Sequence, residues 1–101
     1  MASLELLVLR CENLERTRAY YEAAGLKFTQ EQHGQGARHY SATLGTLVLE
    51  LYPATPEQRP EVGLRLVFAV YEPGEVERRW RAMGHEGHVD PDGRIVVLSP
   101  E

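Results

Sequence analysis

The chain has 101 residues, with 11 Lys and Arg against 15 Asp and Glu, and a formal net charge of -4 at pH 7. This length fits one domain, and 43% hydrophobic with 26% charged residues is typical of a globular rather than a disordered protein. The acidic balance disfavours nucleic acid as a partner, the single cysteine excludes an internal disulfide, and no apolar run approaches the roughly 20 residues of a membrane span. No basic segment followed by an apolar run opens the chain, so we expect a cytoplasmic protein without a membrane partner.

The first half of the chain predicts a strand, a helix and three further strands. Residues 4–11 form a short apolar run typical of a strand, and Cys11 at its end is expected to be a small buried hydrophobe. Asn13 can cap a helix with apolar and aromatic residues at helical spacing, and Gly25 ends that helix. The elements expected next are a strand that starts at Leu26, a glycine-rich reversal over 32–36, and alternating strands over 38–44 and 46–52.

The second half repeats this plan in a shorter form. After a connector over 53–63, residues 64–71 predict an apolar strand, and Pro73 opens a helix with Val76, Trp80 and Met83 on one face. Gly84 ends this helix as Gly25 ends the first. A strand over 85–89, a tight turn over 90–93 and a last strand over 95–98 complete the expected order.

The chain therefore contains an internal repeat. The first copy covers residues 4–52 and the second covers 64–98, which is shorter by about one strand and a turn. Units of this kind place their helices on one face of a sheet and leave the other face concave, and we expect a ligand there.

Four motifs in this order resemble a known family, the vicinal oxygen chelate superfamily of glyoxalases, bleomycin-resistance proteins and extradiol dioxygenases. The first motif runs from Leu9-Arg10 through Asn13–Arg16 and Tyr20-Tyr21 to Gly25-Leu26. The other three are Leu49–Pro53, Leu66–Val70 and Asp90–Gly93. The resemblance covers nearly the whole chain. It implies an α+β fold of two βαβββ modules, the second one shortened, which form a curved mixed sheet around a concave cavity with the helices outside.

The resemblance also implies where a metal ion would bind. Metal-dependent members take their ligands from the first and last strands of each module, and these positions correspond to Leu6, Glu50, Arg65 and Val97. Leu6 and Val97 carry no donor atom, and Arg65 is a permanent cation. We therefore expect no metal ion and no cofactor at these positions.

Strand alternation assigns side chains to the concave face once Glu50 is taken, from the resemblance, as facing inward. The face is then aliphatic with a few polar residues. The expected ligand-binding residues are Arg10, His39, Ser41, Glu50, Tyr52 and Arg65.

Glu50 and Arg65 have two interpretations. Arg65 either anchors an anionic ligand while Glu50 accepts a proton, or the two residues form a structural ion pair in place of the metal. His39 is a candidate general base or a hydrogen-bond partner of the ligand. His33 and His39 flank the glycine turn, and we expect them on different parts of it, which disfavours a metal site between them.

The sequence favours binding of a small organic ligand, anionic or aromatic, in the concave cavity without metal. One alternative is a metal-independent lyase or isomerase in which Glu50 or His39 is the base and Arg65 stabilises an anion. Another is an interaction module without small-molecule chemistry. In each case the shortened second half exposes a sheet edge, and we expect a homodimer that covers it.

Overall fold

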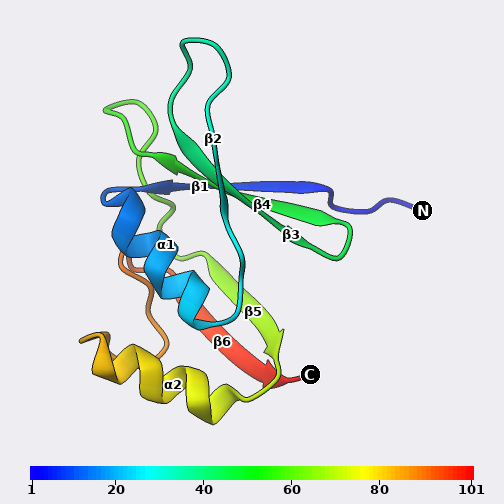
Figure 1. Ribbon diagram of the computed structural model, residues 1–101, viewed down its shortest axis with the longest axis vertical. Helices are drawn as coiled ribbons and strands as arrows, with labels where there is room; N and C mark the ends of the chain where they lie inside the picture. Colours follow the sequence, from blue (N-terminus) through cyan, green and yellow to red (C-terminus); the bar gives the residue numbers. More distant parts are fainter.

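The computed structural model describes all 101 residues and has the expected α+β composition. Figure 1 shows two short helices beside two separate groups of strands. The elements are β1 (Leu6–Cys11), α1 (Leu14–Ala23), β2 (Thr29–Glu31), β3 (His39–Leu44), β4 (Leu47–Pro53), β5 (Arg65–Val70), α2 (Pro73–Ala82) and β6 (Ile95–Pro100). Both helices are only ten residues long, and neither meets the length and hydropathy of a membrane-spanning helix.

The strands form two sheets rather than one. The larger sheet has the order β1-β4-β3-β2, in which β1 is parallel to β4 and the other neighbours are antiparallel. The smaller sheet contains β5 and β6 in parallel. In both halves of the chain, the strand before the helix thus pairs in parallel with the last strand of that half, as an internal repeat requires.

The expected strand over 85–89 is wrong. Residues 85–88 form no strand, with a turn at 87–88, and Val89 makes only one isolated bridge, to Ile95. Gly84 and Gly87 have φ angles of 88° and 52°, a left-handed backbone that interrupts an extended chain. The second half therefore contains no equivalents of β2 and β3, and it has lost more than the one strand expected from its length.

The helix predictions are confirmed in their main features. The Asn13 side chain accepts a hydrogen bond of 3.0 Å from the Arg16 amide, and Gly25 follows the helix with a φ of 104°. Val76 and Trp80 of α2 are buried as expected. Met83 differs, since it caps the helix and is exposed rather than part of the core stripe.

Aromatic packing joins the two helices. The Trp80 ring stacks on the Tyr20 ring with centroids 4.3 Å apart, and the Trp80 indole nitrogen donates a 2.9 Å hydrogen bond to the Tyr20 carbonyl. Both side chains belong to a buried apolar cluster that includes residues of β1, β4 and β6. The two halves of the chain therefore share one hydrophobic core.

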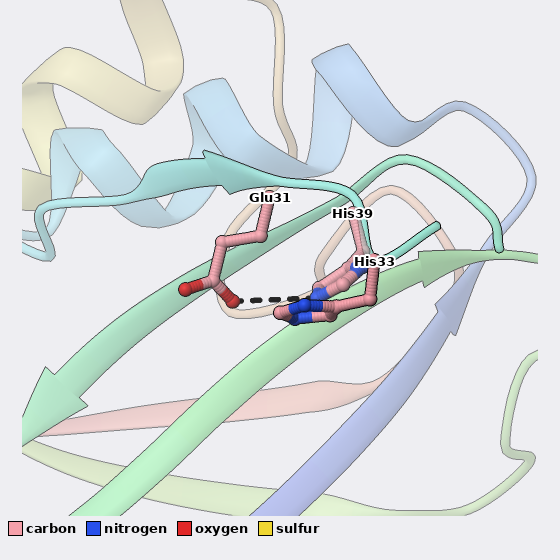
Figure 2. A group of neighbouring side chains, drawn as sticks. All are labelled: Glu31, His33 and His39. Atoms are coloured by element: carbon pink, nitrogen blue, oxygen red, sulfur yellow. Dashed lines mark ion pairs between the residues drawn. The ribbon is translucent and has the colours of Figure 1, made fainter. Parts of the chain in front are cut away.

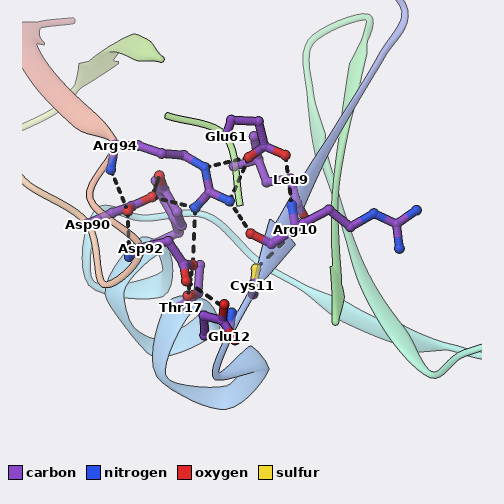
Figure 3. A network of polar contacts seen from close by, with 10 residues as sticks. Leu9, Arg10, Cys11, Glu12, Thr17, Glu61, Asp90, Asp92 and Arg94 are labelled. Atoms are coloured by element: carbon purple, nitrogen blue, oxygen red, sulfur yellow. Dashed lines mark hydrogen bonds and ion pairs between the residues drawn. The ribbon is translucent and has the colours of Figure 1, made fainter. Parts of the chain in front are cut away.

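A buried polar network also joins the two halves (Figure 3). The Arg94 guanidinium is fully buried and contacts the carboxylates of Asp90 at 2.9 Å, Asp92 at 3.2 Å and Glu61 at 2.7 Å. It also donates to the backbone carbonyl of Arg10 on β1. A single cation thus links β6, the preceding turn, the connector and β1.

The two aspartates of this network continue into α1. Asp90 accepts a 2.6 Å hydrogen bond from the Tyr21 hydroxyl, and Asp92 accepts a 3.0 Å hydrogen bond from the Thr17 hydroxyl. The Asp90–Gly93 turn, which the sequence predicts only as a turn, is therefore the point at which the second half is fixed to the first.

Candidate functional site

Five of the six predicted ligand-binding residues lie on one face of the four-stranded sheet. Arg10 pairs in register with Tyr52, and Ser41 pairs with Glu50, so each pair points to the same side. His39 lies two residues before Ser41 on β3 and shares this side. The opposite face carries buried apolar side chains that pack on the helices, among them Leu9, Leu49, Leu51, Tyr40 and Ala42.

The centre of this face is a layered group of three side chains. The rings of Tyr52 and His39 stack with centroids 4.1 Å apart and an interplanar angle of 9°. The Arg10 guanidinium lies over the Tyr52 ring, 5.0 Å from its centroid. Burial and the nearby charge of Glu50 raise the pKa of Tyr52, so its hydroxyl stays protonated and able to donate.

Glu50 lies beside this group near the middle of β4. Its side chain is 17% exposed, and one carboxylate oxygen is 3.7 Å from Nε2 of His39. This carboxylate can accept a proton or a hydrogen bond from a bound molecule, because it is largely shielded from water but not enclosed.

Arg65 lies apart from these five residues. It is exposed at the start of β5 in the smaller sheet, and its guanidinium forms no ion pair with Glu50. One chain therefore does not form the Glu50–Arg65 ion pair that the structural interpretation of these residues requires.

The four positions at which the resemblance implies metal ligands do not fit a metal ion. Leu6 and Val97 have no donor atom, Arg65 is cationic, and the positions are divided between the two sheets. Of the four, Glu50 alone offers an oxygen ligand.

A second polar cluster lies next to the site, and the sequence did not reveal it. Glu31, His33 and His39 place potential ligand atoms within 4.8 Å of one another (Figure 2). His33 follows β2 and His39 begins β3, so the histidines lie on different parts of the hairpin as expected, but their imidazole centroids are only 5.4 Å apart. The missing information was the strand register, because β2 ends at Glu31 and that residue pairs directly with His39 on β3.

Two partly open pockets lie elsewhere. One of about 290 Å³ is lined entirely by apolar residues of β1, β3, β4 and β5, and one of about 340 Å³ lies between the end of α1, β5 and α2. None of the six predicted ligand-binding residues lines either pocket. The predicted face is thus open within a single chain.

Comparison with solved structures identifies the fold. Over 99% of this chain and 96% of the other, the protein superposes on TnmS3, an antibiotic binding protein from Streptomyces sp. CB03234, with a TM-score of 0.72 and 20% identity. It also matches the fosfomycin resistance protein FosX from Listeria monocytogenes, complexed with Mn(II) and sulfate, with a TM-score of 0.69 and 14% identity over 100% and 93% of the chains. A lactoylglutathione lyase from Agrobacterium tumefaciens matches with a TM-score of 0.62 and 16% identity over 97% and 92% of the chains.

No family model matches the chain, and no curated protein matches it either. The structural matches confirm the α+β glyoxalase and bleomycin-resistance fold that the sequence resemblance implied. At these identities the likeness concerns the fold, and activity has to be argued from the residues of this chain.

Proposed function

We propose that the protein binds a small organic molecule on the open face of the four-stranded sheet. The layered group of Arg10, Tyr52 and His39 is the observation that carries this proposal. An arginine held over a stacked pair of rings suits an anionic or aromatic ligand, because its planar guanidinium can pair with a carboxylate or stack on a flat ring. Binding of an antibiotic by TnmS3, which has the same fold, supports the same class of function.

The five residues on this face contribute in different ways. Tyr52 and Arg10 are partly exposed and would contact the ligand directly, while Ser41 and Glu50 provide hydrogen-bonding groups beside them. His39 is 1% exposed, so it would act by supporting Tyr52 from beneath. Aliphatic residues of β1 on the same side, Leu6 and Val8, would add apolar contact area.

A second copy of the chain is the proposed partner. The outer face of the β5–β6 sheet exposes Val67, Ile95 and Val97, and it also carries Arg65. Apolar residues gathered on an unpaired two-stranded sheet favour association over exposure to water. In a homodimer that covers this face, Arg65 could reach a ligand that it does not reach within one chain.

The binding function is favoured over a metal-independent lyase or isomerase. That alternative combines Glu50 or His39 as the base with Arg65 as the anion stabiliser, and within one chain Arg65 lies in the other sheet from both residues. The proposed function also includes no metal-dependent step at Leu6, Glu50, Arg65 and Val97, because these residues do not fit a metal ion.

Thermal shift with a panel of aromatic carboxylates, such as 2-naphthoate, tests the binding function. A ligand at 100 times its Kd stabilises the native state by about 2.7 kcal/mol, which raises the Tm of a domain of this size by roughly 10–20 °C. We expect Tyr52→Ala and Arg10→Met to abolish the shift. Tyr71→Ala, which truncates an exposed tyrosine away from this face, should leave it intact.

Two results would refute the proposal: shifts of equal size in Tyr52→Ala and the wild type, or no shift with any planar or anionic compound. Sedimentation equilibrium tests the partner separately. A monomer at every protein concentration tested would exclude the homodimer while leaving the binding face untouched.

A further inference from the structure

We propose that Glu31, His33 and His39 form a binding site for a divalent metal ion of the Zn²⁺ type, with Glu50 as an additional ligand. This site goes beyond the proposed ligand binding and does not depend on it. Glu31, His33 and His39 come from β2, the β2–β3 turn and β3, and none of the three is among the four positions at which the resemblance implies metal ligands. Glu50 on β4 is the one residue that the two sets share.

The tautomer of His39 is the first argument. Its Nδ1 atom lies 3.0 Å from the backbone carbonyl of Ala37, and a carbonyl only accepts hydrogen bonds. Nδ1 therefore carries a proton, and in the neutral ring Nε2 carries the lone pair. A backbone carbonyl that holds one ring nitrogen while the other is presented as a ligand is the usual support of a metal-binding histidine.

The surroundings of Nε2 are the second argument. Nε2 belongs to a side chain that is 1% exposed, and it faces carboxylate oxygens of Glu31 at 3.3 Å and Glu50 at 3.7 Å. The Tyr52 hydroxyl lies 3.3 Å away, but the two rings are nearly parallel, so it approaches above the ring and not along the lone pair. Three electron-rich atoms thus converge on one point at the edge of the buried His39 ring, where a bound cation would offset their mutual repulsion.

The distances fit a metal ion. A tetrahedral zinc site with bonds of 2.0–2.1 Å separates neighbouring ligand atoms by about 3.3 Å. Nε2 of His39 and Oε1 of Glu31 already have this separation, and Oε2 of Glu50 is within half an ångström of it. The third ligand, His33, needs only a side-chain adjustment, because its ligand atom lies within 4.8 Å of the other two.

The placement of His33 allows this adjustment. It is exposed at the start of the turn that contains Gly34 and Gly36, and its ring already lies against that of His39 (Figure 2). Two imidazoles and a carboxylate are ligands that zinc and its neighbours Co²⁺ and Ni²⁺ prefer, whereas Mg²⁺ and Ca²⁺ prefer oxygen alone.

Titration of the untagged full-length protein with ZnCl₂ by isothermal calorimetry tests the site, and Co²⁺ serves as a visible probe of tetrahedral nitrogen and oxygen ligation. We expect one ion per chain with a Kd in the micromolar range or below. His33→Ala and Glu31→Gln should each weaken binding at least tenfold and abolish the Co²⁺ absorption band. Both residues lie outside the hydrophobic core, so the variants should keep the wild-type Tm.

His88→Ala is the matched control, since it removes an exposed histidine outside the cluster and should leave the affinity unchanged. The proposal is overturned if the wild type shows no saturable Zn²⁺ binding. It is equally overturned if His33→Ala and Glu31→Gln bind Zn²⁺ as tightly as the wild type. Neither result bears on the binding of aromatic carboxylates.

Discussion

Removal of the Arg94 guanidinium should destabilise the protein more than removal of any exposed arginine. Arg94→Met keeps a side chain of similar length but deletes the cation that contacts Asp90, Asp92 and Glu61. The side chains of Asp90 and Asp92 are 0% and 1% exposed, so their carboxylates would remain buried without a positive partner. Breaking a buried ion pair in this way costs about 3–5 kcal/mol.

This cost should be visible as a large loss of thermal stability. For a domain of about 100 residues, 1 kcal/mol corresponds to roughly 4–8 °C in Tm, so Arg94→Met should lower the Tm by roughly 12–40 °C. Urea denaturation should show the same loss as a lower midpoint with an unchanged slope.

The loss should also depend on pH. Without the cation, burial raises the folded-state pKa of the orphaned carboxylates above their unfolded value near 3.9. A raised folded pKa contributes stability at low pH that is lost as the pH rises, so the deficit of Arg94→Met should be smaller at pH 5 than at pH 7. Asp90→Asn combined with Arg94→Met should recover part of the deficit, because one of the stranded charges is then absent.

Arg78→Met is the matched control. Arg78 pairs with Glu75 on the exposed side of α2, where water and salt screen the charges, so the pair adds little to stability. If Arg94→Met fell within about 1 kcal/mol of the wild type, or if its deficit matched that of Arg78→Met, the buried network would not hold the two halves together.

Three further outcomes follow from the packing and the pKa shifts. Trp80→Ala should cost about 3–5 kcal/mol in urea denaturation, since it removes a fully buried ring and its hydrogen bond to the Tyr20 carbonyl; a loss below 1 kcal/mol would contradict the shared core. Hydrogen bonds from the Tyr40 hydroxyl, Arg38 and Arg18 lower the pKa of Glu15 to about 2. The ionised Glu15 carboxylate therefore stabilises the native state above pH 4.5, and this stabilisation is lost as the pH falls toward 2. Glu15→Gln should reduce the pH dependence of the unfolding free energy in this range by no more than about 1 kcal/mol, because the side chain is half exposed. Burial, and then the charge of Asp92, raises the pKa of Cys11 to about 12, so a thiol reagent should label the native protein far more slowly than the urea-unfolded chain, and equal rates would mean that Cys11 is accessible.

Features set by local sequence were predictable. Asn13 and Gly25 bracket α1 because a capping side chain and a left-handed glycine act within one helical turn. The inward face of β4 followed from alternation once the resemblance placed Glu50 inward, and the apolar Leu47, Leu49 and Leu51 on the other side support this assignment.

Features set by contacts between distant segments were not predictable. Nothing near Arg94 in the sequence indicates that its guanidinium reaches the Arg10 carbonyl and Glu61, because these contacts exist only after both halves pack together. The meeting of Glu31 and His39 depends likewise on the β2–β3 register, which a glycine-rich turn leaves open. The separation of Arg65 from Glu50 could not be read from faces alone, because alternation assigns a side chain to a face but not to a sheet.

The short second half explains why the buried network is needed. In the first half, β3 and β2 extend the sheet beside β4 and hold that strand by main-chain hydrogen bonds. β6 has no such neighbours, and the chain before it is a turn with a single bridge. Arg94 and its carboxylates replace those missing hydrogen bonds, but they act at one end of β6 and leave its outward face uncovered. The absence of two strands from the second half thus has two consequences. The first, weaker support of β6, is offset by the polar network. The second, an exposed apolar face, is not offset within one chain, and it is the reason to expect another copy of the chain there.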